Sequence, residues 1–241
     1  MILYPDWFEI FLKMVRILQI ETATQSCSVA ISADGETIAL KEVVAPNVHA
    51  GSLTLFIQEV MKQANLELSE LDAIAVSKGP GSYTGLRIGV STAKGLCFAL
   101  DKPLISVPTL DLMVAGFLAT DAKYKGMVCP MIDARRLEVY TALYTADAAV
   151  LLPVSAKIID AESFKEELSN DLITFIGDGA EKCSTIIHSP NAAFSTLNFN
   201  SAAYMSLMSL SAYETKSFED LAYFEPFYLK DFMLTQPKKQ F

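Results

Sequence analysis

A glycine-rich segment, Lys78-Gly79-Pro80-Gly81-Ser82-Tyr83-Thr84-Gly85-Leu86-Arg87-Ile88-Gly89, constrains the fold of this chain more than any other. It follows the short apolar run 73–76 and precedes a long apolar helical pattern, so it predicts a strand, a turn and a helix in that order. Glycines in such a turn let another backbone come close, or expose N–H groups that hold an anion. The glycine spacing fits neither the P-loop nor the dinucleotide-binding fingerprint. The segment is therefore a glycine-rich turn that lacks the side chain with which the known motifs bind phosphate.

Composition limits the class of partner. The chain has 241 residues, of which 51% are hydrophobic and 20% charged, which suits one large domain or two small lobes with an ample core. With 19 basic against 28 acidic residues, the net charge is −9. Nucleic-acid affinity comes from the neutralisation of phosphates by Lys and Arg. We therefore expect this chain alone to bind nucleic acid poorly, and any role on RNA or DNA would need a basic partner.

The cysteines and the N-terminus indicate the compartment. The chain lacks a CxxC pair, and its cysteines lie far apart in apolar runs, which is typical of buried free thiols: Cys27, Cys97, Cys129 and Cys183. Residues 1–13 carry acidic residues and no small-residue cleavage site, so they do not resemble a signal peptide. No apolar run approaches the length of a membrane span. We expect a cytoplasmic protein with no membrane contact.

Apolar patterning predicts two blocks with the same order of elements. The first reads strand-strand-strand-helix-strand-helix and ends on a further strand, over 16–22, 27–32, 37–43, 51–64, 73–76, 83–100 and 104–107. The second repeats the order over 127–133, 137–145, 152–159, 162–168 and 172–176, with a final helix that ends at residue 187. Duplicated blocks of this kind, with antiparallel hairpin edges and parallel core strands, predict a two-lobed α/β protein.

The same patterning divides the chain. We expect an N-terminal extension over 1–15, an N-terminal lobe over 16–108, a C-terminal lobe over 109–230 and a tail over 231–241. A helix over 201–216 follows the second block, and whether it packs back on the first lobe is left open. Residues 1–13 show no periodicity tied to the core, so the extension is expected to be dispensable for folding.

The first strand of each block ends in an acid followed by small or polar residues, in Glu21-Thr22-Ala23-Thr24 and in Asp133-Ala134-Arg135. Paired acids on hairpin ends position the phosphates of Mg-ATP in the actin and sugar-kinase superfamily. The alternative is that each acid ends a strand and caps a turn. Spacing alone favours this alternative.

Four segments together carry a family resemblance: residues 16–24, the glycine-rich turn, Ile132-Asp133-Ala134-Arg135 with Glu138-Val139-Tyr140, and Glu225-Pro226-Phe227-Tyr228-Leu229-Lys230. In order and spacing they resemble the TsaB (YeaZ) family from about Val15 to Lys230. The resemblance implies the two-lobed actin-like (ASKHA) fold. It also implies a non-catalytic scaffold that works with TsaD and TsaE to place a threonylcarbamoyl group on the adenosine next to the anticodon of tRNAs. In that family TsaD, a paralogue, holds the metal and the chemistry, ATP is used by the partners, and tRNA is reached only through the complex.

The residues that depart from the catalytic paralogue argue against a metal in this chain. TsaD uses two histidines at i and i+4, whereas here Leu53 follows His49 at that spacing, and His188 lies in the other block. One imidazole does not make a stable metal site. We expect no metal, and a capping or first-turn role for His49.

Bound nucleotide is not expected either, so no cofactor is assigned. Glu21 stands where the family usually has Asp, which pushes the carboxylate deeper into the cleft. The turn at Gly177 and Gly179 resembles the superfamily's adenosine-binding loop, but we interpret it as a tight strand-to-helix connection. Glu21, Asp133, Gly177 and Gly179 are therefore only weak candidates for cofactor binding.

The helix after the glycine-rich turn predicts a partner surface. A strip at i, i+4, i+7 and i+11 of that helix, together with two residues of the 51–64 helix, would allow another helix pair to pack closely: Gly85, Gly89, Thr92 and Leu96, with Leu53 and Ile57. The alternative is that both faces cover the sheet of their own lobe. The family resemblance implies a four-helix contact with TsaD or with a second copy in a homodimer, which fits the first interpretation.

Two rival functions remain open. An independent ATPase or kinase of the actin-like superfamily would need a working cleft, for which Glu21 and Asp133 are the only support. A homodimer resembling an inactive peptidase would have no role on tRNA. Neither a zinc pair nor a catalytic triad supports peptidase activity.

Overall fold

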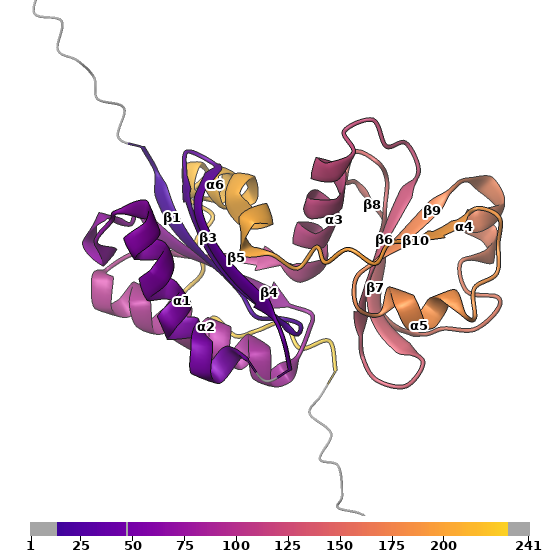
Figure 1. Cartoon of the computed structure of the whole chain (residues 1–241), viewed down its shortest axis with the longest axis horizontal. Coiled ribbons are helices and arrows are strands. Elements are labelled where there is room, and N and C mark those ends of the chain that lie inside the picture. Colours follow the sequence, from indigo (N-terminus) through magenta and orange to yellow (C-terminus); the bar gives the residue numbers. More distant parts are fainter. Residues whose placement is uncertain (1–13, 47, 231–241) are drawn as a thin grey trace, which may run out of the picture.

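The computed structural model describes residues 14–46 and 48–230, which form two lobes, each built on a five-stranded sheet (Figure 1). The strand order is β3-β2-β1-β4-β5 in the first sheet and β10-β9-β6-β7-β8 in the second. Both sheets join an antiparallel three-stranded meander to two parallel strands, so the second order, read from β8, repeats the first. The predicted duplication within a two-lobed α/β fold is confirmed.

The bounds of most elements lie within a few residues of the predicted ones. The first lobe contains β1 (Arg16–Glu21), β2 (Ser26–Ala33), β3 (Glu36–Val44), α1 (His49–Ala64), the short helix η1 (Leu68–Glu70), β4 (Ala73–Gly79), α2 (Tyr83–Leu100) and β5 (Leu104–Pro108). After α3 (Thr109–Thr120), the second lobe contains β6 (Met127–Asp133), β7 (Glu138–Tyr144), β8 (Val150–Ile158), α4 (Lys165–Asn170), β9 (Ile173–Ile176), α5 (Ala180–Ser184) and β10 (Ala192–Phe194). The last elements are η2 (Ala202–Met205) and α6 (Ser206–Glu214). The sequence did not predict η1 or β10, which are too short to show a period, and the single helix predicted over 201–216 is divided into η2 and α6.

Helices α1 and α2 cover one face of the first sheet (Figure 1). The face of α1 that is apolar at helical spacing is buried there: Leu53, Phe56, Ile57, Val60 and Met61. It packs on strand residues that point to the same side, among them Leu18, Ile20 and Ile74. Amphipathic periodicity thus explains this layer.

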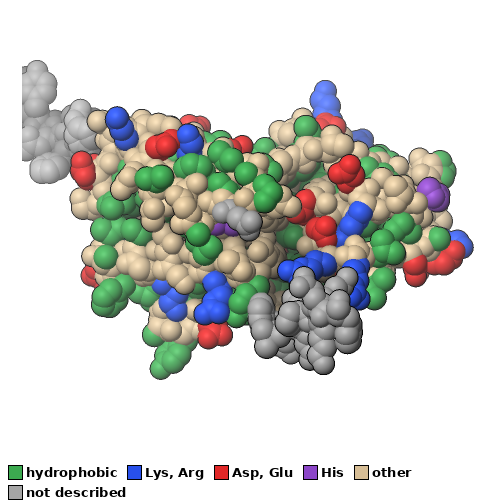
Figure 2. All heavy atoms as spheres, turned by 60° about the horizontal axis from the view of Figure 1, so that its bottom comes forward, with side chains coloured by type: hydrophobic (Ala, Val, Ile, Leu, Met, Phe, Trp, Pro, Cys, Tyr) green, Lys and Arg blue, Asp and Glu red, His purple; other side chains and the backbone are tan. Residues whose placement is uncertain are grey.

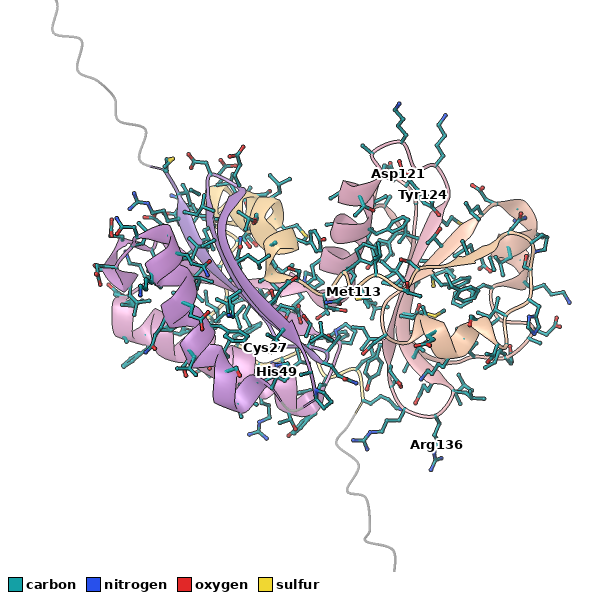
Figure 3. The ribbon with its side chains drawn as sticks, viewed as in Figure 1. Cys27, His49, Met113, Asp121, Tyr124 and Arg136 are labelled. Atoms are coloured by element: carbon teal, nitrogen blue, oxygen red, sulfur yellow. The ribbon has the colours of Figure 1, made fainter. Side chains whose placement is uncertain are left out.

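Helix α3 joins the two lobes through a shared core. It is apolar on nearly all sides and buries Leu110, Met113 and Phe117, as expected for a helix enclosed by protein. The same cluster holds Ile17 from the first sheet and Ile132 from the second, and Figure 3 shows Met113 between the lobes. The lobes therefore share this hydrophobic cluster.

After β10 the chain returns to the first lobe. Helix α6 and η2 pack on the first sheet, on the face opposite α1 and α2. Polar groups make part of this contact, because the side-chain amide of Gln19 donates hydrogen bonds to Ser32 Oγ at 2.9 Å and Ser206 Oγ at 3.3 Å, and the Ala202 N–H donates to Ser28 Oγ at 2.9 Å. The last helix, α6, thus packs back on the first lobe, the arrangement that the sequence left open.

Residues 218–230, which we call the C-terminal strap, run along the first lobe to the second. Glu219 N–H donates to the carbonyl oxygen of Leu104 at 2.9 Å, and Phe227 N–H donates to that of Lys78 at 2.7 Å. At its end Lys230 forms an ion pair with Glu138 of β7. The strap therefore adds a further connection between the lobes.

Other expectations concern the thiols and the chain ends. All four cysteines are buried and free, as predicted. None of the helices within 14–46 and 48–230 combines the length and the apolarity that a membrane crossing requires. The predicted roles of residues 1–13 and of the tail over 231–241 lie outside the described residues.

The small-residue strip of α2 faces its own lobe. A Cβ built on Gly85 would lie 2.1 Å from the carbonyl oxygen of Thr22, and one on Gly89 would lie 2.2 Å from Thr22 Oγ1. Leu53 and Ile57 are buried in the core beneath α1, whereas Thr92 and Leu96 are half-buried. The predicted partner contact is therefore wrong for Leu53, Ile57, Gly85 and Gly89. The alternative, that these faces cover their own sheet, is what the structure shows.

The packing of Gly89 can be tested with a matched pair of variants. Gly89→Ala should destabilise the protein by roughly 1–3 kcal/mol, because the added methyl group overlaps Thr22 Oγ1, which must then move away from its hydrogen bond to the carbonyl oxygen of Gly85. Gly95→Ala is the control in the same helix, because nothing lies within 4 Å of its added Cβ. It should stabilise the protein by about 1 kcal/mol through helix propensity. Urea unfolding measures both, and equal stabilities of the two variants would contradict the packing.

Candidate functional site

The glycine-rich turn holds protein backbone on its inner side. A Cβ on Gly81 would lie 2.4 Å from the carbonyl oxygen of Ala23, and the Ser82 N–H donates to that same oxygen at 2.6 Å. Thr22 Oγ1 donates to the carbonyl oxygen of Gly85 at 2.9 Å, and the Gly85 N–H donates to Ser82 Oγ at 3.3 Å. The N–H groups of Ser82 and Gly85 are thus bonded within the lobe. Of the two uses of such a turn, close backbone approach is the one observed.

The outer side of the turn holds the C-terminal strap. Gly79 has φ +113°, and a Cβ there would lie 2.6 Å from the carbonyl oxygen of Phe227. The rings of Tyr83, in the turn, and Tyr228, in the strap, also contact each other, with centroids 4.8 Å apart. Two of the four segments that carry the family resemblance are therefore in direct contact.

Glu21, at the end of β1, is buried and turned onto its own backbone. Its Oε1 accepts a hydrogen bond from the Ala23 N–H at 2.5 Å. Within the described residues, neither Glu21 Oε2 nor the buried Ser77 Oγ has a hydrogen-bond partner. Because Ile20 pairs with Val76 in the parallel sheet, Glu21 and Ser77, each one residue further on, lie beside each other on neighbouring strands. Burial raises the pKa of Glu21 to about 7, against a smaller opposite effect of the hydrogen bond from the Ala23 N–H.

Asp133, at the end of β6, is half-exposed and already paired. Its Oδ1 accepts hydrogen bonds from the Arg135 N–H at 2.6 Å and from Lys182 Nζ at 2.7 Å. Lys182 also donates to the carbonyl oxygen of Glu138 at 2.7 Å. Figure 2 shows acidic and basic side chains next to each other on the second lobe, close to its junction with the first. Both block-ending acids thus accept the N–H two residues further on, as the turn-capping alternative predicts.

The turn at Gly177 and Gly179 is a tight connection from β9 to α5. Gly177 has φ +98°, and a Cβ there would lie 2.5 Å from the carbonyl oxygen of Met131. The Gly179 N–H donates to that oxygen at 3.0 Å. Between them, Asp178 Oδ1 accepts the Asp133 N–H at 3.0 Å, and burial raises the pKa of Asp178. Hydrogen bonds therefore hold this turn against the end of β6.

His49 begins α1 and serves the same lobe. Its Nε2 lies 2.8 Å from the carbonyl oxygen of Thr24, to which the neutral ring donates when Nε2 carries the proton. Burial lowers the pKa of His49, so the neutral form is favoured. Burial together with Glu21 raises the pKa of the Cys27 thiol to about 11. Within residues 14–46 and 48–230, no three His, Cys, Asp or Glu side chains are grouped to hold a metal ion.

Two cavities lie away from these residues. One of about 390 Å³ lies at the end of α1 and includes Met61, Asn65 and Leu68 in its lining. The other, of about 510 Å³, lies between Lys78 and the strap and includes Glu219 and Phe227. Neither cavity is lined by Glu21, Asp133, Gly177 or Gly179.

The sequence did not predict all of the residues that position Glu21 and Asp133. Lys182 lies 49 positions from Asp133 and reaches it only once α5 packs beside β6. Ser77 and Asp178 likewise become neighbours of the acids through the sheets. The acids themselves were found because each ends the first strand of a block.

The duplicated sheets with an acid-capped turn after each first strand define a two-lobed protein of the actin-like class. A solved structure titled "Activator of the 2-Hydroxyisocaproyl-CoA Dehydratase from Clostridium difficile with bound ADPNP" has the same fold, with TM-score 0.50 and 8% identity over 84% of this chain and 97% of that one. "YeaZ from Pseudomonas aeruginosa" superposes with TM-score 0.77 and 26% identity, over 90% of this chain and all of that one. The predicted actin-like fold is confirmed.

Sequence comparison gives the family. A family model described as "TsaD: tRNA N6-adenosine threonylcarbamoyltransferase" matches residues 42–231. The tRNA threonylcarbamoyladenosine biosynthesis protein TsaB of Escherichia coli K12 is 38% identical over 133 residues, and the match spans 55% of this chain but only 56% of the relative. The protein of that name from Haemophilus influenzae is 28% identical over 91% of this chain and 95% of the relative. The chain belongs to the family that the model describes and, within it, to the TsaB (YeaZ) branch.

Glu21 should make stability depend on pH. Its folded pKa of about 7 exceeds the ordinary 4.5, so the folded state holds the proton more tightly than the unfolded chain. The Glu21 contribution to the free energy of unfolding should therefore fall by about 3 kcal/mol as the pH rises from 4.5 to 7, and stay constant above. Glu21→Gln imitates the protonated acid and should remove this fall, whereas Glu214→Gln, at an exposed position, should keep it. Urea unfolding from about pH 5 to about pH 8 measures the slopes, and parallel curves for the wild type and Glu21→Gln would disprove the assignment.

Proposed function

We propose that this chain is a non-catalytic scaffold subunit in the biosynthesis of threonylcarbamoyladenosine in tRNA, working with TsaD and TsaE. The relatives from Escherichia coli and Haemophilus influenzae carry this pathway in their names, and the matched family model describes the transferase itself. The net charge of −9 supports contact with tRNA through partners rather than by this chain alone.

We infer the non-catalytic role from the surroundings of Glu21 and Asp133, the acids that end the first strand of each block. Mg²⁺ bound with nucleotide phosphates needs carboxylate oxygens that are open to it. Glu21 is buried against the Ala23 N–H, and Oδ1 of Asp133 already accepts hydrogen bonds from Lys182 and from the Arg135 N–H. These residues do not fit a Mg-ATP site, so we assign no catalytic step to this chain and leave the use of ATP to the partners.

The proposed function is tested in the cell and on the isolated chain. Depletion of the protein should lower the content of threonylcarbamoyladenosine in tRNA, because the transferase loses its scaffold. Nucleotide titration of the isolated protein should give no saturation at micromolar concentrations. Unchanged tRNA after depletion would favour the homodimer without a tRNA role. A Kd for ATP of about 1 μM or tighter would instead favour an independent ATPase or kinase.

The outer face of α1 and α2 is the proposed contact with TsaD or with a second copy of the chain. These helices lie together on the outside of the first lobe (Figure 1). Leu55 of α1 is 54% exposed and Phe98 of α2 is 83% exposed, although both are large apolar side chains. Such residues are frequent anchors of protein interfaces. They replace Leu53, Ile57, Gly85 and Gly89 as the contacts we propose.

Phe98→Glu should weaken the capture of TsaD by at least about 30-fold, the effect of losing an interface residue worth about 2 kcal/mol. The matched control is Leu207→Glu on α6, where the side chain is 73% exposed on another face. Both variants should keep the wild-type Tm, because neither residue is buried. Pull-down with TsaD and size-exclusion chromatography measure the effect. Equal capture by the two variants would place the partner elsewhere.

A further inference from the structure

The hairpin between β6 and β7 has an unusual tip. Arg135 and Arg136 have φ of +73° and +53°, the left-handed region that L side chains rarely adopt. The connection is closed by hydrogen bonds from the Ala134 N–H to Glu138 O at 3.1 Å and from the Glu138 N–H to Arg135 O at 3.2 Å. Hairpin connections with φ above zero prefer Asn and Gly. Two consecutive arginines therefore occupy a backbone conformation that does not suit them. Such a mismatch is common at functional sites.

The charges around the tip leave both arginines without an internal partner. Arg135 and Arg136 are exposed, and neither forms an ion pair within the described residues. The two nearest acids along the chain are engaged, Asp133 by Lys182 and Glu138 by Lys230. Figure 3 shows Arg136 at the end of the hairpin, pointing away from the second lobe. The guanidinium groups are thus presented to an external anion.

The C-terminal strap ends at the same hairpin, through the ion pair of Lys230 with Glu138. This ion pair occupies Glu138. In a chain with net charge −9, the tip therefore presents two cationic side chains that no acid of the described residues neutralises. Guanidinium groups bind phosphate oxygens in a bidentate manner, which suits a polyanionic backbone.

We propose that the Arg135–Arg136 tip contacts the phosphate backbone of tRNA within the assembled complex. This proposal rests on the proposed function, which supplies the polyanion. The tip adds a local contact to a complex whose main affinity for tRNA comes from the partners. It thereby orients the tRNA relative to this subunit, because phosphate contacts fix the register of a bound nucleic acid.

The test uses the complex with TsaD and TsaE and measures tRNA affinity across a salt series. The double variant Arg135→Ala with Arg136→Ala should bind tRNA about tenfold more weakly and reduce the slope of log K against log salt by about 2, one for each lost phosphate contact. Lys123→Ala with Lys125→Ala is the control, because it removes the same charge from exposed positions between α3 and β6. It should leave affinity and slope close to those of the wild type.

A second variant separates a role in binding from one in folding. Arg135→Asn with Arg136→Gly supplies residues that suit the backbone, so it should raise Tm while showing the same loss of tRNA affinity. Wild-type affinity and salt slope in both tip variants would overturn the proposal. So would weaker assembly with TsaD in the absence of tRNA, since the anion would then be an acidic protein segment. If the wild-type complex itself binds no tRNA, the proposed function fails first and the proposal fails with it.

Discussion

The absence of side chains at four glycines allows three pieces of backbone to meet beside β4. Gly81, Gly85 and Gly89 admit the turn after β1, and Gly79 admits the C-terminal strap. The position of Glu21 depends on this contact, because the turn that fills the space is the one whose Ala23 N–H meets its carboxylate. The space beside this glycine-rich turn, where related turns bind phosphate, is filled by the backbone of the protein itself. The same sequence pattern therefore serves architecture here, because the N–H groups of Ser82 and Gly85 at the start of α2 are bonded to oxygens of the protein itself.

The two halves treat the same topological position differently. Each first strand ends in an acid that caps the next turn, but Asp133 is half-exposed and neutralised by Lys182, whereas Glu21 is buried and its pKa is raised to about 7. An ion pair close to solvent and a proton in the interior are alternative ways to avoid an uncompensated buried charge. Both make the carboxylate a poor ligand for Mg²⁺. The duplication is thus retained in the topology and lost in the electrostatics.

Periodicity predicted most of the fold, because the sheets and α1 have clear apolar faces; the bounds of β6 agree with those predicted. The resemblance supplied the way in which the two blocks combine. The partner strip failed because spacing groups Gly85 with Gly89 on one face but does not say what lies against it, and the neighbour is Thr22 in the turn after β1. Likewise Lys182 meets Asp133 only through tertiary packing. Contacts between elements distant in sequence leave no periodic signal.

The path of the chain has a consequence for the order of folding during synthesis. The strands of the first sheet leave the ribosome first, but η2, α6 and the strap, which cover its second face and its edge, leave last. A nascent chain that ends before residue 202 therefore exposes Ile17, Ala73 and Ile105 wherever α3 does not cover them. The second lobe can be complete while the first is still waiting for its final residues. Translation speed near the C-terminus then determines how long that apolar face stays open to chaperones or to aggregation.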